Sequence, residues 1–284
     1  MNGLLRTPVS AIPHVLTLDM TRKCQASCQM CFNQSGPMGD HGSMTDADWS
    51  RVVDQAHALG IGKVQPFGGE ITMHPFALTL VMHALKLGME AEIYSNLIHV
   101  SDGWLDVFQR PGISVATSYH SADPDVHNSI TGRDSHRKTR ANIAKLAWLG
   151  VPLRVGIVGD DQDVTEAARR DLETLSVANI RVDRVRHLGR SAEGGTEPDL
   201  AQLCGRCGIG KAAVNPDGIV SPCPMSEFLS IGNVRDLDLA DILSGTRMTE
   251  TIEAIRTAVP YLEGCDPDEE CSPGVPGSHC NPRT

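Results

Sequence analysis

Short runs with apolar side chains at alternate positions recur through the first 190 residues of the chain. This alternation is typical of β-strands, because successive side chains of a strand point to opposite faces of the sheet. Turn residues bound each run, and longer stretches separate one run from the next. The runs that predict strands are 14–20, 63–67, 90–94, 113–118, 153–158 and 180–186.

Apolar residues at helical spacing fill most of the stretches between these strands. Thr45, with Asp48 three residues later, predicts a capped N-terminus for the first helix. Trp49 begins its apolar stripe, and the helix is expected to end near Gly60. Further helices are predicted over 75–87, 104–108, 139–149 and 163–176, whereas the segment after His120 predicts a polar loop.

The alternation of strand and helix predicts an α/β fold with a parallel sheet and right-handed crossovers. A complete eight-stranded barrel typically needs about 250 residues, and only six units fit before the pattern changes. We therefore expect a partial (β/α)6 TIM-like barrel. A Gly- and Ser-rich linker over 189–195 predicts a domain boundary near residue 190, with the barrel in 1–190 and a small Cys-rich domain in 191–284.

Composition narrows the class of protein. The chain has 284 residues, nine cysteines and a formal net charge of −10. It contains no apolar run long enough for a transmembrane helix, and its N-terminus does not resemble a signal peptide. Cysteines without an export signal favour metal ligation in a reducing cytoplasm. The negative charge argues against nucleic-acid binding, which needs clustered Lys and Arg.

Three cysteines follow the first predicted strand at C-x3-C-x2-C spacing: Cys24, Cys28 and Cys31. Three thiolates on one short loop can converge on one metal centre, but a closed zinc or iron–sulfur site normally takes four protein ligands. The loop therefore leaves either one open position or a fourth ligand from elsewhere in the chain. A zinc knuckle, or three thiols buried only for packing, are the alternatives at this point.

One strand–helix unit later the chain reads Gly68-Gly69-Glu70. Together with the cysteine loop, this motif resembles the signature of the radical S-adenosylmethionine (radical SAM) superfamily. The resemblance implies a [4Fe–4S] cluster on Cys24, Cys28 and Cys31, with S-adenosylmethionine bound to the fourth iron. It also implies reductive cleavage to a 5′-deoxyadenosyl radical, which takes a hydrogen atom from the substrate. The electron would come from a reductant such as flavodoxin or ferredoxin.

The resemblance also suggests which residues contact the cofactor, all of them near the C-terminal ends of strands, where parallel α/β folds place their sites. Gly68, Gly69 and Glu70 would bind the amino group of S-adenosylmethionine. Met30 stands where the family usually has an aromatic residue, and its thioether can pack on adenine. Candidates for the ribose hydroxyls are Ser95, Asn96 and Ser118, and the candidate for the methionine carboxylate is Arg133. Ordinary loop polarity is the alternative for these four residues.

The residues that face the substrate are harder to choose. Candidates for the catalytic residue are Glu92, Tyr119 and His120, with His127 as a further residue near the substrate. A surface or packing role remains open for each of them.

Six further cysteines lie beyond residue 190: Cys204, Cys207, Cys223, Cys265, Cys271 and Cys280. The spacing C-x10-G-x4-C from Cys207 through Gly218 to Cys223 resembles the start of a SPASM or twitch extension. Such an extension implies one or more auxiliary [4Fe–4S] clusters. The later spacings depart from the fuller pattern of that extension, and a zinc ribbon is the alternative, because C-x2-C is also a zinc-ligand spacing.

The resemblance implies an enzyme whose substrate is a ribosomally synthesised peptide, in which it makes a thioether, a carbon–carbon crosslink or an epimerised centre. A separate protein would then bind the leader of that peptide. The same radical chemistry on a small molecule, such as a sugar, an alcohol or a precursor of an antibiotic or cofactor, is the first alternative. A non-catalytic iron–sulfur or zinc protein is the second. We expect neither nucleic acid nor a membrane as a partner.

Overall fold

Residues 12–192 and 197–259 are described by a computed structural model of the chain. Their strands form one sheet in the order β6-β5-β4-β3-β2-β1-β7-β8-β9. The pairs from β1 to β6 are parallel, β7 is parallel to β1, and β8 and β9 are antiparallel additions. The strands are β1 (Val15–Asp19), β2 (Lys63–Phe67), β3 (Glu90–Tyr94), β4 (Ile113–Ser118), β5 (Leu153–Val158), β6 (Asn179–Asp183), β7 (Lys211–Val214), β8 (Ile219–Ser221) and β9 (Gly232–Asn233).

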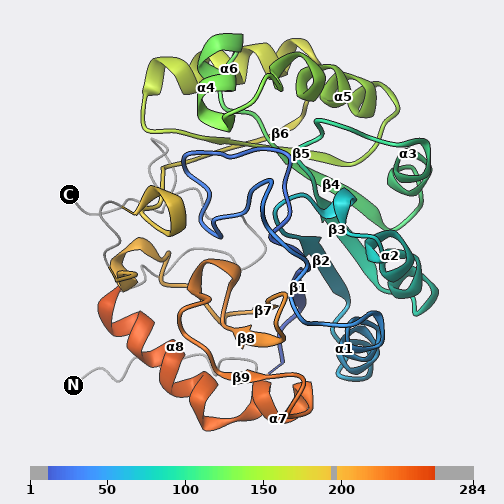
Figure 1. The fold of residues 1–284 in the computed structure, drawn as a ribbon, viewed down its shortest axis with the longest axis vertical. Coiled ribbons are helices and arrows are strands. Elements are labelled where there is room, and N and C mark those ends of the chain that lie inside the picture. The colour runs from blue at the N-terminus through green and yellow to red at the C-terminus, as the bar shows by residue number, and fades with distance from the viewer. Residues whose placement is uncertain (1–11, 193–196, 260–284) are drawn as a thin grey trace, which may run out of the picture.

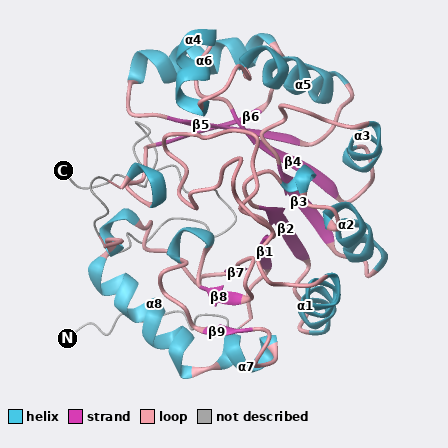
Figure 2. Cartoon of the chain, in the orientation of Figure 1, coloured by secondary structure: helices cyan, strands magenta, loops and turns pink. Residues whose placement is uncertain are grey.

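The α-helices between the parallel strands lie along the outer side of the curved sheet, and the loop after β1 fills the inner side (Figure 1). Figure 2 shows that long loops, rather than helices, occupy this inner region. The helices are α1 (Asp46–Ala58), α2 (Ala77–Lys86), α3 (Asp102–Phe108), α4 (Pro124–Thr131), α5 (His136–Trp148), α6 (Gln162–Thr174), α7 (Leu239–Ser244) and α8 (Thr246–Ala258). The mixed α/β architecture with six parallel strands confirms the predicted fold class.

The first helix begins where its cap predicts. Thr45 Oγ1 accepts a hydrogen bond from the Asp48 amide at 3.2 Å, and the Asp48 carboxylate accepts one from the Thr45 amide at 3.0 Å. Such a reciprocal pair satisfies two of the amides that every helix leaves unpaired at its N-terminus. The capping box predicted from the sequence is confirmed.

The polar loop expected after His120 is wrong, because this segment contains helix α4. Asp123 caps the helix by accepting from the amides of Asp125 and Val126, and Pro124 occupies its first turn. Gly132 ends it with φ of +63°, a left-handed conformation that suits glycine. The helix is short and mostly polar, with only His127 and Thr131 buried. It therefore has no apolar stripe, and only its caps mark it in the sequence.

The main hydrophobic core lies between the sheet and its outer helices. Leu16 and Leu18 of β1 are fully buried, as are Trp49 of α1 and Ile157 of β5. Burying a large apolar side chain contributes about 1.5–3 kcal/mol, so this layer holds the strands in their order.

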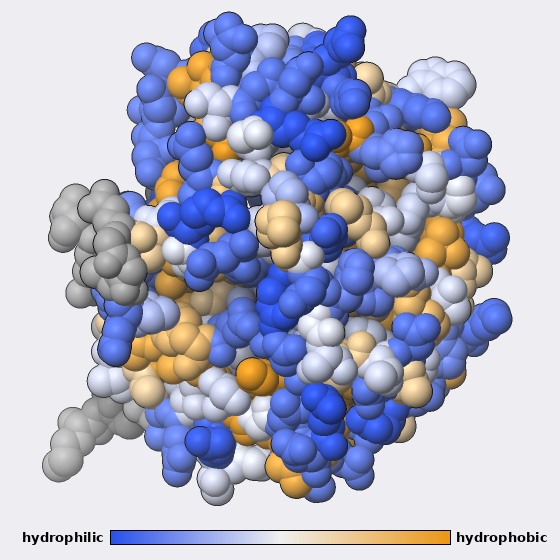
Figure 3. All heavy atoms as spheres, in the orientation of Figure 1, coloured by the Kyte–Doolittle hydropathy of each residue, from blue (hydrophilic) through white to orange (hydrophobic). Residues whose placement is uncertain are grey.

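The opposite side of the sheet carries polar side chains, of which Thr17, Gln65 and Glu92 are joined by hydrogen bonds across β1, β2 and β3. Figure 3 shows that hydrophilic residues cover most of the molecular face turned to the viewer.

The C-terminal segment is joined to the barrel through the sheet. Val15 of β1 pairs with Lys211 of β7, and Met248 and Ile252 of α8 belong to the main core. The sheet thus continues across the boundary predicted near residue 190, and that boundary remains a prediction. Within the described ranges, no helix is long and apolar enough to cross a membrane.

Candidate active site

The cysteine loop begins directly after β1 and is held by backbone hydrogen bonds to its own return segment and to the end of α4. The Cys24 amide donates to Gly36 O at 3.0 Å, which closes the loop on itself. The amides of Ser27 and Gln29 donate to Thr131 O and Ile130 O at the end of α4, at 3.0 and 2.9 Å. Helix α4, which the sequence pattern did not predict, therefore anchors the middle of the loop.

The three thiols lie in protected surroundings. Cys24 is 6% exposed, and Cys28 and Cys31 are half-buried. Burial raises the pKa of Cys24 to about 12 and that of Cys28 to about 11, and it raises the pKa of Cys31 as well. Thiolates form at such positions when a bound metal supplies positive charge. Three reduced thiols on one protected loop fit the ligand set that an iron–sulfur cluster needs.

Gly68 and Gly69 lie flat against the backbone that leads into Cys24. A Cβ on Gly68, whose φ is +152°, would stand 2.4 Å from Thr21 O, and one on Gly69 would stand 2.5 Å from Lys23 O. The Gly69 amide donates to Thr21 O at 2.6 Å. Only residues without a side chain allow this approach, so the two glycines fix the end of β2 beside the cysteine loop.

Glu70 is 1% exposed, and its carboxylate is held by the protein itself. It accepts hydrogen bonds from Ser95 Oγ at 2.8 Å and the Asn96 amide at 2.8 Å, and from the Thr72 hydroxyl at 2.7 Å and amide at 3.1 Å. Burial raises the pKa of this carboxyl group, and the four donors act against that rise. Glu70 thus joins the loops after β2 and β3, and its predicted contact with S-adenosylmethionine remains a prediction.

Two of the other predicted cofactor residues contact the cysteine loop. Asn96 Nδ2 donates to Cys24 Sγ at 3.6 Å, and Asn96 Oδ1 accepts from Gln25 Nε2 at 3.1 Å. The Arg133 guanidinium donates to Gln25 O at 2.9 Å. Ser118 is exposed at the end of β4, and Met30 is half-buried on the cysteine loop. The structure therefore gathers Glu70, Ser95, Asn96 and Arg133 around the start of the cysteine loop, as candidates for binding a ligand there.

Tyr119 and His120 do not join this group. The Tyr119 hydroxyl donates to Asp171 of α6 at 2.6 Å and lies 2.8 Å from His136 Nε2 of α5. The rings of Tyr119 and His120 pack beside His127, with centroid distances of 5.4 and 5.6 Å. All three side chains are buried in this cluster. Here they pack between the end of β4 and helices α4 and α5.

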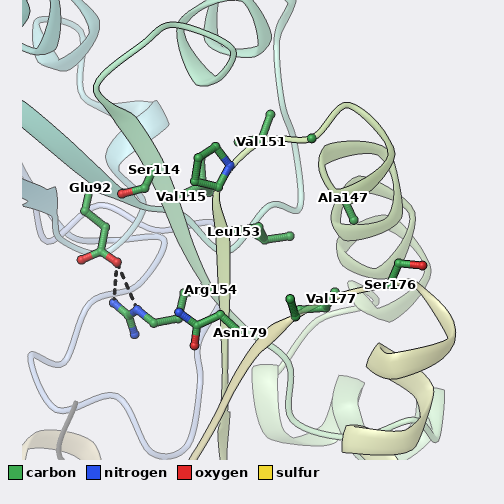
Figure 4. A pocket seen from close by; sticks show the side chains of 13 residues that line it. Glu92, Ser114, Val115, Ala147, Val151, Leu153, Arg154, Ser176, Val177 and Asn179 are labelled. Carbon is green, nitrogen blue, oxygen red and sulfur yellow. Dashed lines mark hydrogen bonds and ion pairs between the residues drawn. The ribbon is translucent and has the colours of Figure 1, made fainter. Parts of the chain in front are cut away.

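Glu92 is the middle residue of β3, and its side chain lies on the inner side of the sheet. It accepts from Arg154 Nε at 3.0 Å and from Gln65 Nε2 at 2.6 Å. Figure 4 shows the Glu92–Arg154 pair at the wall of a cavity of about 430 Å³ that also contacts Ser114 and Asn179. These residues stand at the N-terminal part of β4 to β6, whereas the cysteine loop follows the C-terminal end of β1. The cavity therefore lies toward the end of the sheet opposite the cysteine loop, and Glu92 contacts it from the middle of β3.

Sequence reasoning missed a buried carboxyl group at the end of β1. The Asp19 side chain is 6% exposed. Its Oδ2 accepts a hydrogen bond from Asn33 Nδ2 at 3.4 Å, whereas its Oδ1 is buried without a side-chain donor among the described residues. Burial, and secondly the nearby Glu227, raise its pKa to about 7. Asn33 in turn lies 3.0 Å from Cys31 Sγ. An acidic residue closing an otherwise apolar strand was the available signal.

The C-terminal cysteines form a second group. Cys207 is 1% exposed and Cys223 is 8% exposed, and their sulfur atoms lie 3.1 Å apart. Hydrogen bonds to Cys204 and Cys223, together with burial, raise the pKa of Cys207. Cys207 and Cys223 belong to an apolar cluster with Leu188, Leu203 and Ile255, and Phe32 of the first cysteine loop packs against it. Cys265, Cys271 and Cys280 lie outside the described residues.

Among the described cysteines none forms a disulfide. Nor do three His, Cys, Asp or Glu side chains of these residues converge on one ion-sized position. Cys207 and Cys223 contact each other directly instead. Metal binding would therefore replace this sulfur–sulfur contact.

Comparison with known proteins agrees with this geometry. The sequence model of the Radical SAM superfamily matches residues 18–173, and that of the SPASM iron–sulfur cluster-binding domain matches residues 197–272. The PqqA peptide cyclase of Xanthomonas campestris is 29% identical over 154 residues, which are 53% of this chain and 41% of that protein. The chain thus matches less than half the length of that relative. The sporulation killing factor maturation protein SkfB of Bacillus subtilis is 24% identical over 87% of this chain and 70% of its own length.

Solved structures share the fold. The crystal structure of Streptococcus suis SuiB bound to its precursor peptide SuiA has a TM-score of 0.73 at 15% identity, covering 87% of this chain and 68% of SuiB. The family match covers more than half of the chain. The chain therefore belongs to the radical SAM superfamily, and its C-terminal part matches the SPASM iron–sulfur cluster-binding domain.

Proposed function

We propose that this enzyme modifies a ribosomally synthesised peptide, by forming a thioether or carbon–carbon crosslink or by epimerising a residue. The observation that carries the proposal is the packing of the first cysteine loop, through Phe32, against the cluster that holds Cys207 and Cys223. Two metal sites in such proximity suit hydrogen abstraction at one and binding or oxidation of the substrate at the other. A peptide substrate is supported by its similarity to a peptide cyclase, to a maturation protein and to SuiB, which was solved in complex with a precursor peptide.

When bound, the cluster and S-adenosylmethionine supply a 5′-deoxyadenosyl radical. The residues of this chain would divide the remaining work. Cys24, Cys28 and Cys31 would hold the cluster, with Asn96 and Arg133 fixing the Gln25 segment between them. The close approach of Gly68 leaves no side chain between β2 and the cysteine loop. Burial of Cys24 keeps water from the first ligand.

Cys204, Cys207 and Cys223 would hold part of an auxiliary cluster in the second group. The proposal includes two protein partners, a reductant such as flavodoxin or ferredoxin and a separate protein that binds the peptide leader. Cytoplasmic location belongs to the same proposal, because both the clusters and the reductant require a reducing compartment.

The test combines the anaerobically reconstituted enzyme, S-adenosylmethionine and dithionite with synthetic short peptides encoded beside its gene. Mass spectrometry in D2O distinguishes the products: loss of two hydrogen atoms marks a crosslink, and uptake of one deuterium marks epimerisation. The matched control is the enzyme with Cys24, Cys28 and Cys31 all changed to Ala. Formation of 5′-deoxyadenosine with every peptide left unmodified would contradict the proposal.

A small-molecule substrate is the second candidate, favoured by one structural neighbour. BtrN in complex with AdoMet and 2-DOIA has a TM-score of 0.56 at 14% identity and is covered over 88% of its length. In the same assay, a sugar or alcohol that stimulates 5′-deoxyadenosine formation and is itself oxidised would favour this candidate over a peptide.

A further inference from the structure

The segment Leu188–Arg190 lies against both cysteine groups, although the sequence pattern assigned Gly189 and Arg190 to a linker. It follows β6 and includes a short 3-10 turn, Gly189–Ser191. Gly189 has φ of +59°, and a Cβ there would stand 2.1 Å from Phe32 O and 2.6 Å from Cys31 O. Glycine is required at this contact for its conformation and for its lack of a side chain. The segment is therefore fitted to the cysteine loop and is not a free connection.

Arg190 binds four carbonyl groups of the stretch from Cys28 to Ser35. Its amide donates to Cys31 O at 2.9 Å, and its guanidinium donates to Cys28 O at 2.5 Å. The same guanidinium donates to Gln34 O at 3.1 Å and to Ser35 O at 2.7 Å. A planar guanidinium with five N–H groups can span several acceptors at once, which an ammonium on a flexible stem cannot.

The same segment is anchored on the other side to the C-terminal cysteines. Leu188 is 4% exposed and packs in the apolar cluster with Cys207 and Cys223. Arg186 donates to Gln202 O at 2.9 Å, two residues before Cys204, and to Asp183 at the end of β6 at 3.0 Å. The stretch Arg186–Arg190 thus connects the second cysteine group to the carbonyls of the first.

The charge of Arg190 lies beside the cysteines themselves. Its guanidinium contacts the carbonyl of Cys28 and that of Ser35, on either side of Cys31 in the sequence. An arginine keeps its charge at every working pH, and a partly buried site screens that charge less than water does. A positive charge beside two cluster ligands favours the reduced, more negative state of whatever cluster they hold.

We propose that Arg190 is a positioning residue that fixes the loop bearing Cys28 and Cys31 and raises the reduction potential of the cluster bound there. The guanidinium fixes the loop through its hydrogen bonds to the carbonyls of Cys28, Gln34 and Ser35, and its charge raises the potential. The proposal requires membership of the family but is independent of the substrate, so it stands or falls separately from the proposed peptide chemistry.

The test compares reconstituted wild type with Arg190→Gln, which removes the charge, and Arg190→Lys, which keeps the charge but loses the fork of donors. Arg170→Gln is the matched control, because Arg170 is exposed on α6 and forms an ion pair with Glu166, away from both cysteine groups. Redox titration followed by electron paramagnetic resonance measures the potential of the cluster whose signal changes when S-adenosylmethionine is added. Hydrogen exchange of the metal-free chain measures how firmly residues 28–35 are held.

We expect Arg190→Gln to show a lower potential, with a several-fold smaller fraction of the cluster reduced at a fixed applied potential. Arg190→Lys should keep most of the potential, yet exchange the amides of residues 28–35 several-fold faster than wild type. The control should match wild type in both measurements. An unchanged potential in Arg190→Gln would overturn the proposal. If Arg190→Gln binds no iron, its potential cannot be measured and Arg190→Lys decides. Hydrogen exchange at residues 28–35 and an iron content equal to those of wild type in Arg190→Lys would then overturn the proposal.

Discussion

The two cysteine groups of this enzyme are assembled in different ways. Cys24, Cys28 and Cys31 lie on one continuous loop, whose amides pair with the end of α4 and with its own return segment. Cys207 and Cys223 come from either side of the β7–β8 hairpin, and packing brings their sulfur atoms within 3.1 Å. Leu188 from the end of the barrel and Ile255 from α8 complete that second cluster.

This difference shows how far spacing alone defines each group. A single loop sets its ligand positions by spacing, so the first group can be read directly from the residues. Spacing also indicates Cys207 and Cys223, but the surroundings of the second group come from residues such as Leu188 and Ile255, which are distant in sequence and meet only in the folded chain. It follows that the first group should respond chiefly to changes in its own loop, and the second to changes in its ligands and in the core around them.

The largest effect is expected when the first group is removed. Changing Cys24, Cys28 and Cys31 together to Ala should abolish formation of 5′-deoxyadenosine, because no thiolate remains to hold the cluster. Iron and acid-labile sulfide after anaerobic reconstitution should fall from about eight irons per chain to about four, if one four-iron auxiliary cluster is present. A fall from about four to none would assign the C-terminal cysteines to zinc or to plain thiols. Persisting 5′-deoxyadenosine would contradict the assignment of these ligands.

Changing Cys207 or Cys223 to Ala should separate the two groups. We expect the variant to retain the first cluster and cleave S-adenosylmethionine without substrate, yet to lose nearly all modified product. Chromatography of both products measures this in one reaction. Ser221→Ala is a suitable control, because Ser221 is buried beside the group but offers no thiol. Undiminished product from the cysteine variants would mean that the second group has no role in turnover.

The regular parts of the fold were predictable because they repeat one simple rule. Each of the six parallel strands alternates a helix-facing apolar side with an inner side, so periodicity located β2 to β5 residue for residue. Helix α4 escaped because its caps, rather than apolar positions, define it. The strands β7, β8 and β9, which extend the sheet beyond β1, are too short for an alternation of apolar and polar residues to be recognised in the sequence.

In the candidate site, spacing indicated the first cysteines and the glycines, since both are local requirements. It did not indicate where side chains would point. Tyr119 and Ser118 are neighbours in sequence, but adjacent residues near the end of a strand face opposite ways, and Tyr119 meets Asp171 behind the sheet. Arg190 lay in what composition marked as a linker, and no local pattern could show that it reaches the carbonyls of Cys28 and Ser35.

A smaller effect on the first group is expected from Glu70→Ala. The change leaves the donors of Ser95, Asn96 and Thr72 without their common acceptor, and an unsatisfied buried donor costs about 1–3 kcal/mol. We expect affinity for S-adenosylmethionine to fall by about tenfold, which equals about 1.4 kcal/mol, with little change at the second cysteine group. Calorimetric titration of the reconstituted enzyme measures it, and Glu70→Gln tests whether the charge or the acceptor matters. Unchanged affinity in both variants would leave Glu70 a purely structural residue.

The smallest effect expected at neutral pH is the contribution of two buried histidines to stability, which changes only when the solution is made acidic. Burial lowers the pKa of His120 to about 4 and that of His127 to about 3, against about 6.5 for an unperturbed histidine. Between pH 6.5 and pH 4 the unfolded chain therefore binds more protons than the folded chain, and the free energy of unfolding falls as the pH falls through that window. The loss is on the order of 3 kcal/mol for His120 alone by pH 4. Asp19, whose pKa is raised, acts in the opposite direction.

Acid should consequently loosen the first cysteine group before the second. His127 lies on α4, whose last carbonyls accept the amides of Ser27 and Gln29, whereas the Gly208 amide beside Cys207 donates to Pro222 O, away from these histidines. In the metal-free chain, hydrogen exchange at Ser27 and Gln29, corrected for intrinsic rates, should rise on going from pH 7 to pH 5 before exchange at Gly208 does. His127→Phe should reduce that dependence, and His57→Gln, a change on the exposed face of α1, should leave it intact. Equal acid sensitivity of both groups would mean that the helix under the first loop does not set its stability.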